Sequence, residues 1–189
     1  MNSQTSMIAI GLATALYFLA RKADPADISE PRPIPKGLTI TEAEALGYIM
    51  ANKMAYPALS VLPESVVMAT IAVESNFDPN AIAPAGERGL MQVIYPGTWN
   101  DVLKRAKLPD DLDSFKPKDN ILVGMQYLRL VRAEFLRDGI IEGNSSNDWT
   151  LVDQGYNMGP ANVKRGNRNQ TRLGRFLLAR EKFQLAGLP

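Results

Sequence analysis

Residues 63 to 92 read PESVVMATIAVESNFDPNAIAPAGERGLMQ, and the first half of this stretch decides how the middle of the chain folds. It opens on a proline followed by a glutamate, which suits the first turn of a helix. Residues 66 to 73 continue as an apolar run. Glu74 comes three residues after Ile71, so the two positions share one face of the expected helix. The pattern predicts a buried helix that ends at a carboxylate.

The place of Glu74 on an apolar face indicates a chemical role. A carboxylate there either reaches solvent at the helix end or is partly desolvated, and desolvation raises its pKa because it disfavours the charged form. A carboxylic acid that keeps its proton near neutral pH can act as a general acid. We therefore take Glu74 as the candidate catalytic residue. An ordinary exposed glutamate in a last helical turn is the alternative.

The composition narrows the possible chemistry. The chain has 189 residues, of which 46% are hydrophobic and 22% charged, so one folded domain with an extension is expected. Its net charge of +1 does not indicate a nucleic-acid-binding protein. The absence of cysteine and histidine excludes disulfides, a Ser-His-Asp triad and histidine-bound zinc. Acid-base chemistry must then come from a carboxylate, a lysine or a tyrosine, and no metal or cofactor is expected.

The sequence around this stretch predicts a mostly helical domain. Thr41 and Glu44 fit a capping box at the start of one helix. Residues 76 to 89 are rich in Pro, Gly, Asn and Ala and predict a long loop, with at most a small β-hairpin. Apolar residues then recur every three or four positions. Further helices are expected over residues 96–107, 116–135, 148–156 and 172–185.

Residues 1 to 22 form a separate apolar segment. Residues 7 to 20 read MIAIGLATALYFLA without a charge, and as a helix they would be about 21 Å long, short of the ~30 Å hydrocarbon core of a membrane. Three interpretations stay open: an uncleaved short membrane anchor, a cleaved signal peptide, or a helix buried against protein in a virion or a secretion assembly. Arg21 and Lys22 follow, and they favour a cytoplasmic carboxyl side.

Residues 23 to 37 read ADPADISEPRPIPKG and join this segment to the helical domain. Their alternating prolines exclude a helix and favour an extended spacer, and a loop packed on the folded domain is the alternative. The chain is thus expected to contain an apolar segment (1–22), a proline-rich linker (23–37) and one folded domain (38–189).

Several short sequence blocks follow one another from the middle of the chain onward. The blocks are Glu74-Ser75, Gly89-Leu90-Met91-Gln92, Pro96 with Thr98, Asp119-Asn120-Ile121, and Tyr156-Asn157 with Gly159-Pro160. In this order they resemble the soluble lytic transglycosylase (SLT) family, over roughly residues 60 to 163. The chain departs from the family's pattern at Gly155, where alanine usually precedes the Tyr-Asn pair, and at Glu87, which adds a charge.

The resemblance implies a lysozyme-like α+β fold, mostly helical and similar to goose-type lysozyme. It implies an enzyme that cleaves the β-1,4 bond between N-acetylmuramic acid (MurNAc) and N-acetylglucosamine (GlcNAc) in peptidoglycan and leaves a 1,6-anhydro-MurNAc end. The single catalyst would be Glu74, and no cofactor is implied. Two alternatives stay open: a hydrolytic lysozyme (muramidase) with a second carboxylate, and a structural or wall-binding subunit with little catalysis.

The resemblance also implies substrate-binding residues near Glu74. Ser75 would form a hydrogen bond close to the catalytic carboxyl, and Gln92 would donate to an acetamido or hydroxyl group of the sugar. Gly89 would permit a tight turn beside the cleft. Tyr156 would hold Glu74 through its hydroxyl.

Other residues in the blocks have more open roles. Met91 would face either the sugar or the core, and Asn157 would contact either the substrate or a neighbouring loop. Asp153, one turn before Tyr156, is not expected to be a second catalyst. The expected protein is membrane-associated and opens peptidoglycan locally, in the periplasm or cell wall, for a phage particle or a secretion machine.

Residues 164 to 182 contain seven basic residues and one acidic residue. Arg165, Arg168, Arg172 and Arg175 recur at helical spacing, with apolar residues on another side. We interpret this stretch as the solvated face of an amphipathic last helix. The alternative is attraction to the anionic cell wall, to phospholipid or, least expected, to nucleic acid.

Overall fold

The computed structural model describes residues 41–189, and the predicted apolar segment and proline-rich linker lie outside the described residues. The described part is mostly helical with one small hairpin, as predicted. Its elements are α2 (Glu42–Ala55), η2 (Pro57–Val61), α3 (Glu64–Glu74), β1 (Glu87–Arg88), β2 (Val93–Ile94), α4 (Gly97–Ala106), α5 (Pro117–Arg137), α6 (Ser146–Met158), α7 (Pro160–Lys164) and α8 (Gln170–Leu185). From residue 41 onward, no helix is long and apolar enough to cross a membrane.

A local capping signal places the start of α2 where the sequence predicts it. The backbone N–H of Glu44 donates to Thr41 Oγ1 at 3.1 Å, and the backbone N–H of Thr41 donates to Glu44 Oε2 at 2.7 Å, which completes the capping box. Ser145 and Asp148 form a second capping box at the start of α6. The short helices η2 and α7 were not predicted, because five residues are too few to show a helical period.

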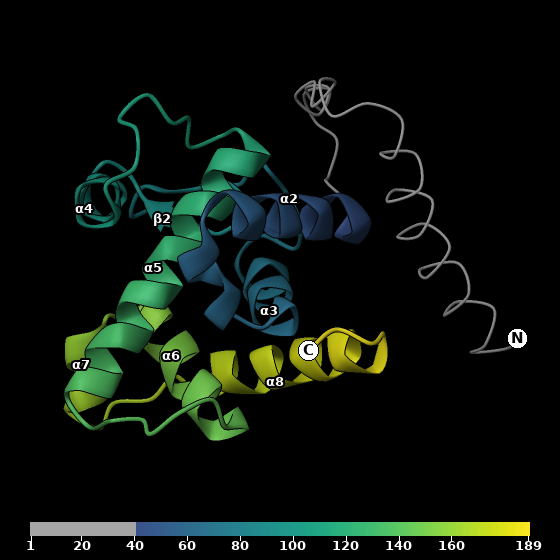
Figure 1. Cartoon of the computed structure of the whole chain (residues 1–189). Coiled ribbons are helices and arrows are strands. Elements are labelled where there is room, and N and C mark those ends of the chain that lie inside the picture. Colours follow the sequence, from purple (N-terminus) through teal and green to yellow (C-terminus); the bar gives the residue numbers. More distant parts are fainter. Residues whose placement is uncertain (1–40) are drawn as a thin grey trace, which may run out of the picture.

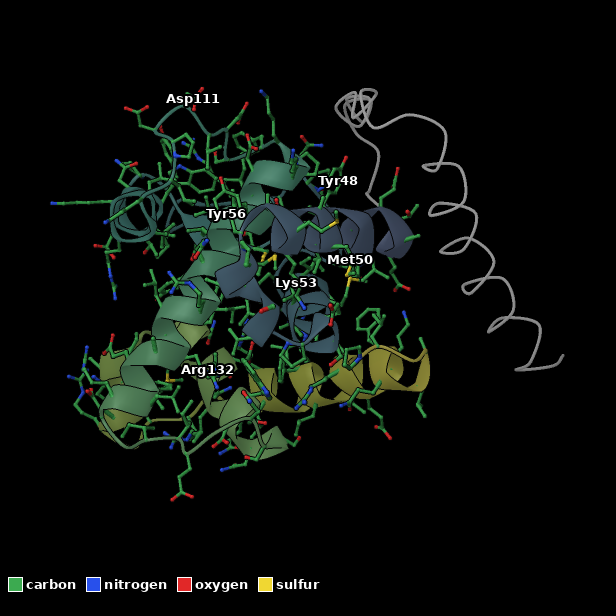
Figure 2. The ribbon with its side chains drawn as sticks, viewed as in Figure 1. Tyr48, Met50, Lys53, Tyr56, Asp111 and Arg132 are labelled. Carbon is green, nitrogen blue, oxygen red and sulfur yellow. The ribbon has the colours of Figure 1, made fainter. Side chains whose placement is uncertain are left out.

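Helix α3 lies in the middle of the molecule, between α2 and α8, and the long helix α5 crosses beside it (Figure 1). Almost every side chain of α3 is buried, so its sequence shows no polar face. Figure 2 shows Lys53 of α2 directed toward α3, where its ammonium group lies 2.6 Å from Glu64 Oε1. Because α2 and α8 cover α3 from two sides, apolar residues occur on every face of this helix.

The hairpin follows the loop after α3. Strand β1 pairs antiparallel with β2, with Glu87 opposite Ile94 and Arg88 opposite Val93. The expected hairpin is therefore present, but it lies at the end of the predicted loop and beyond it. The turn between its strands carries Met91 into the core.

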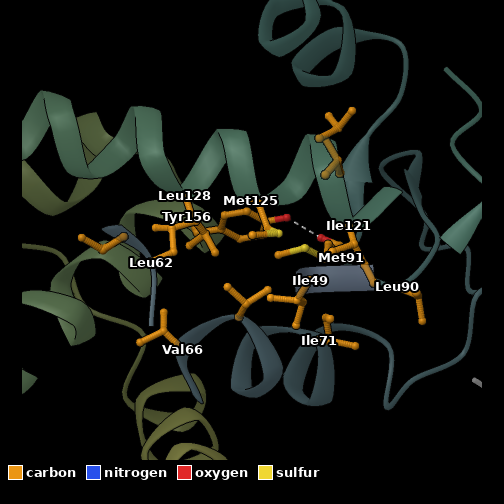
Figure 3. Packing of buried hydrophobic residues seen from close by; sticks show 14 of the residues in the cluster. Ile49, Leu62, Val66, Ile71, Leu90, Met91, Ile121, Met125, Leu128 and Tyr156 are labelled. Atoms are coloured by element: carbon orange, nitrogen blue, oxygen red, sulfur yellow. Dashed lines mark hydrogen bonds between the residues drawn. The ribbon is translucent and has the colours of Figure 1, made fainter. Parts of the chain in front are cut away.

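The core lies between α3, α5 and the turn of the hairpin (Figure 3). Leu90 and Met91 are fully buried there. Gly124 of α5 makes room for Met91, since a Cβ at this glycine would lie 2.4 Å from the methionine sulfur. Packing thus holds the hairpin turn against the helices that surround Glu74.

Candidate active site

Glu74 is the last residue of α3, and only 14% of its side chain is exposed. Burial raises the pKa of Glu74 to about 7, even though the Arg172 guanidinium beside it acts in the opposite direction. The negative charges of Asp153 and Glu87 add to the upward shift. The expected desolvated carboxyl at the end of an apolar helix is therefore present, and it can hold or release a proton near neutral pH.

Arg172 of α8 reaches this carboxyl from the other end of the sequence. Its Nη1 lies 3.0 Å from Glu74 Oε1. Its Nε and Nη2 donate to both oxygens of Asp153, at 3.0 and 2.7 Å. Sequence reasoning missed this residue, because its two partners are on other helices.

The interpretation of the basic stretch as a solvated face is wrong for Arg172 and Arg180, whereas Arg165, Arg168 and Arg175 are exposed as predicted. Arg172 and Arg180 are 5% and 7% exposed, and Arg175 donates from Nη2 to the backbone carbonyl of Val73 at 3.0 Å. Helix α8 packs along α3, and this contact buries basic side chains together with apolar ones. Of the four arginines at helical spacing, Arg172 alone is buried, and sequence period alone does not distinguish an inner helix face from an outer one.

Ser75 and Gln92 fasten the loop around Glu74. The Ser75 hydroxyl donates to the carbonyl of Leu90 at 2.8 Å, next to the carboxyl as expected. The Gln92 amide nitrogen donates to the carbonyls of Ala81 and Gly89, at 3.0 and 2.8 Å. Both amide hydrogens of Gln92 are engaged within the chain, so the expected donation to a sugar requires one of these bonds to break.

Gly89 makes the tight turn that the sequence predicts. Its φ is +70°, and a Cβ at this position would lie 2.5 Å from Asn120 Nδ2. Asn120, which sequence reasoning left without a role, accepts from the Met91 N–H at 2.8 Å and donates to the carbonyls of Arg88 and Ser114 at 2.9 and 2.8 Å. The position of Asn120 in the block Asp119-Asn120-Ile121 was the sequence feature that could have indicated this role.

Tyr156 lies near Glu74 but does not hold it as predicted. Its buried hydroxyl donates to the Met91 backbone carbonyl at 2.6 Å (Figure 3). Burial raises the pKa of Tyr156 well above its usual value, so the hydroxyl keeps the proton that it donates. Met91 points into the core, the second of its two expected orientations. Asn157 is exposed and accepts from Asn169 Nδ2 at 3.1 Å, a contact with the neighbouring loop.

The departure at Gly155 has a steric reason. A Cβ at this position would lie 2.7 Å from both Phe135 Cζ and Val131 Cγ1 of α5. The larger side chains of α5 therefore require glycine in front of Tyr156, which keeps α6 close enough for the tyrosine to reach Met91.

The structure thus brings Ser75, Gly89, Met91, Gln92 and Tyr156 together around the turn beside Glu74, whereas Asn157 lies toward the loop before α8. Residues 41–189 contain no cluster of His, Cys, Asp and Glu suited to a metal ion. The chemistry available at this site is proton transfer by Glu74, next to the ion pair of Arg172 and Asp153.

Comparisons with known proteins agree with this fold. The sequence model of the Transglycosylase SLT domain family matches residues 55–178. A membrane-bound lytic murein transglycosylase C from Actinobacillus succinogenes is 33% identical over 107 residues, which are 55% of this chain and 29% of that protein. The protein of the same name from Photorhabdus laumondii is 31% identical over 107 residues, with the same coverage of 55% and 29%.

A solved structure shows the same fold. It is that of the lytic transglycosylase Slt from Pseudomonas aeruginosa, an inactive mutant, with 21% identity and a TM-score of 0.50 over 71% of this chain and 21% of that one. The chain thus spans less than a third of the length of these relatives. The match of the family model over most of the helical domain shows that the chain belongs to the Transglycosylase SLT domain family.

Proposed function

We propose that this chain is a peptidoglycan lytic transglycosylase that cleaves the β-1,4 bond between MurNAc and GlcNAc, with Glu74 as its single catalytic residue. One observation supports the proposal most: a largely buried carboxyl, with its pKa raised to about 7 by burial, ends the central helix of an SLT domain. The relatives are named as murein transglycosylases, which supports peptidoglycan as the substrate.

The proposed reaction needs one group that first gives and then takes a proton. Protonated Glu74 donates its proton to the glycosidic oxygen while the bond from that oxygen to MurNAc C1 breaks. The C6 hydroxyl of the same sugar then attacks C1, and the Glu74 carboxylate takes the hydroxyl proton. The products are a free GlcNAc hydroxyl and a 1,6-anhydro-MurNAc end, and no water is consumed. The nucleophile belongs to the substrate, so it acts at a high effective concentration.

A hydrolytic lysozyme would need a second carboxylate that reaches a water molecule. In the described part of the chain, two carboxylates act on Glu74, namely Asp153 and Glu87. Asp153 is fully buried, and both its oxygens accept hydrogen bonds from Arg172. Glu87 is partly exposed on β1 and accepts from the Ala85 N–H at 3.0 Å. Glu87 is thus the residue that the hydrolytic alternative would use.

A polar hollow offers room for part of a glycan strand. It has a volume of about 380 Å³, and its lining residues include Asp101, Arg105, Tyr127 and Glu134. The Tyr127 ring, which lines the hollow, packs on the Tyr156 ring with their centroids 4.9 Å apart. Tyr156 in turn lies near Glu74, so these two rings connect the hollow to the surroundings of the carboxyl. Charged and hydroxyl groups in such a wall suit the hydroxyl and acetamido groups of a glycan.

The proposed setting is local opening of the cell wall by a membrane-associated enzyme, in the periplasm or as part of a phage particle or secretion machine. Its support is the uncharged sequence of residues 7 to 20 and the proline-rich stretch that follows, together with the membrane-bound relatives. Contact with a membrane or with a virion would occur through residues 7 to 20. Peptidoglycan strands are the expected partner of residues 41–189.

The test uses the full chain, purified in mild detergent, with Glu74→Gln as the matched inactive control. Peptidoglycan sacculi are digested and the released muropeptides are weighed by mass spectrometry. Anhydro products that disappear with Glu74→Gln are expected. Products heavier by one water that also disappear with Glu87→Gln would replace the proposal by a lysozyme. No soluble product from the folded wild type would overturn the enzymatic function.

A further inference from the structure

Glu74, Arg172 and Asp153 form one ion cluster contributed by three helices. Arg172 Nη1 lies 3.0 Å from Glu74 Oε1, and Arg172 Nη2 lies 2.7 Å from Asp153 Oδ1. The exposed fractions of the three side chains are 14% for Glu74, 6% for Arg172 and 1% for Asp153. Solvent therefore screens these charges little, and each interacts strongly with the others.

The hydrogen bonds determine how charge is shared in this cluster. Arg172 donates from Nε and Nη2 to both oxygens of Asp153, the forked geometry of a guanidinium with an ionised carboxylate. The charge of Arg172 is therefore neutralised by Asp153. Ionisation of Glu74 as well would leave one net negative charge largely buried, which is unfavourable.

We propose that Arg172 and Asp153 are positioning residues for Glu74: Arg172 orients the Glu74 carboxyl, and Asp153 neutralises Arg172 so that the guanidinium does not withdraw the proton from it. This inference rests on the proposed function, since the arrangement matters for catalysis only if Glu74 is the general acid. Asp153 then has a role of its own although it touches no substrate. The two residues act on the reaction only through Glu74.

The remaining groups that face Glu74 do not replace this pair. Tyr156 of α6 is neutral and donates its proton to Met91. Glu87 of β1 is negative and raises the pKa of Glu74. Arg175 of α8 is directed to the carbonyl of Val73. In the described part of the chain, Arg172 is the cation that acts on Glu74 and opposes the effect of burial, so its neutralisation affects how firmly that carboxyl holds its proton.

The first experiment removes the charge of Asp153 and keeps its shape. In Asp153→Asn, the positive charge of Arg172 acts on Glu74 without compensation and stabilises the Glu74 carboxylate. The general acid then loses its proton at lower pH. The alkaline limb of the kcat/KM profile on soluble peptidoglycan strands is expected to move down by about one pH unit, so that kcat/KM falls by about fivefold at the pH of the former midpoint and by roughly tenfold well above it.

Two further variants separate charge from structure. In Arg172→Met combined with Asp153→Leu, neither charge is present, and the alkaline limb is expected to return to within half a unit of the wild type. Arg180→Met is the matched control, because it removes a similarly buried arginine from the same helix, away from Glu74. Its alkaline limb is expected to stay in place.

The outcomes decide between a positioning and a merely structural role. An alkaline limb that does not move in folded Asp153→Asn, or that moves equally in Arg180→Met, overturns the proposal. If Asp153→Asn does not fold, Arg172→Met gives the test of opposite sign: its limb should move to higher pH, because the cation is gone and Asp153 stays, and an unmoved limb overturns the proposal.

A spectroscopic readout keeps this test independent of the proposed function. The infrared carboxyl band that the wild type shows and Glu74→Gln lacks reports the protonation of Glu74 directly. Its midpoint should shift downward in Asp153→Asn even if no peptidoglycan is cleaved. A protein without activity whose Glu74 midpoint shifts as expected would refute the enzyme and keep the charge coupling, whereas an active enzyme with an unmoved midpoint would refute the coupling alone.

Discussion

Helix α8 places two arginines of similar burial in opposite surroundings. Arg172 and Arg180 lie about two turns apart, with exposed fractions of 5% and 7%. Arg172 contacts the carboxyls of Asp153 and Glu74. Arg180 donates to the Ser146 hydroxyl at 3.1 Å, and its buried Nε has no hydrogen-bond partner among residues 41–189.

The two arginines also differ in the direction of their pKa shifts. Burial lowers the pKa of Arg180, with no carboxylate to oppose it in the described part of the chain. Burial acts in the same direction on Arg172, but Asp153 and Glu74 outweigh it and the pKa is raised. An arginine on the inner face of a helix thus becomes part of an ion cluster only where other helices supply carboxylates.

The largest expected difference between the two ends of α8 is in stability. Arg172→Met leaves two buried carboxyls without their cation and should lower the free energy of unfolding by about 3–5 kcal/mol at pH 8. Arg180→Met removes a buried charge that lacks a counterion, and it should change the free energy of unfolding by less than about 1 kcal/mol. Urea unfolding followed by circular dichroism measures both.

The loss in Arg172→Met should also depend on pH. Burial raises the pKa of Asp153 even beside Arg172, and loss of the cation should raise it further, so the variant should lose stability as the pH rises and recover it at low pH, where the carboxyls are protonated. Equal losses for the two arginines at pH 8, or a loss for Arg172→Met that does not change with pH, would contradict the comparison.

A somewhat smaller effect on stability concerns Glu74, which lies beside Arg172. Burial raises its pKa from 4.5 to about 7, so the folded wild type binds this proton more tightly than the unfolded chain does. The free energy of unfolding should therefore fall as the pH rises from about 4.5 to about 7, and Glu74→Gln should lack this dependence. Above pH 7 the variant should be more stable than the wild type by about 3 kcal/mol, with near equality at pH 4.

Thermal unfolding of both proteins across this pH range measures the effect of Glu74. The glutamine keeps an oxygen that accepts from Arg172, so the comparison isolates the charge. Parallel stability curves for the two proteins would show that burial does not shift the titration of Glu74.

The next effect on stability tests the loop of residues 89 to 92, which lies beside Glu74. Tyr156→Phe removes the hydroxyl that donates to the Met91 carbonyl at 2.6 Å and keeps the ring. The buried carbonyl loses its donor, so the free energy of unfolding should fall by about 2 kcal/mol. Hydrogen exchange of the loop amides should increase at the same time. Unchanged exchange at residues 89 to 92 would mean that packing alone holds the loop.

The smallest effect lies on α8 between the two arginines. Gly174 is exposed, and a Cβ there would meet nothing within 4 Å. Gly174→Ala should therefore raise the free energy of unfolding by about 0.5–1 kcal/mol, because alanine has the higher helix propensity. Gly155→Ala on α6 is the matched contrast, since its Cβ would lie 2.7 Å from Phe135 and should destabilise the protein. A loss of stability in Gly174→Ala would show that this part of α8 is not an ordinary helix interior.

Much of the fold follows from local signals in the sequence. The capping pair of Thr41 and Glu44 and the regular apolar residues of α5 gave helices that the structure confirms. Glu74 stood out because it follows an apolar run, and burial does raise its pKa. These features depend on residues that are close together in the sequence, so the sequence alone can show them.

The errors share a different cause. The sequence predicts a solvated face for Arg172 and a contact with Glu74 for the Tyr156 hydroxyl, and both predictions are wrong because the actual partners lie far away in the sequence. The amide of Gln92 was expected to bind a sugar, but it donates to two backbone carbonyls that only the folded loop brings near. A side chain's type restricts its possible partners without selecting one.

The sequence by itself determined the helical class, the family and the residue most suited to acid-base catalysis, since these rest on local periodicity and on residue types in a fixed order. Only the tertiary structure decided the surroundings of that residue. The contact of α8 with α3 and α6 brings Arg172 and Asp153 to Glu74 and leaves the cluster largely buried. Burial and charge pairing are properties of the assembled helices, and they control whether the Glu74 carboxyl holds its proton.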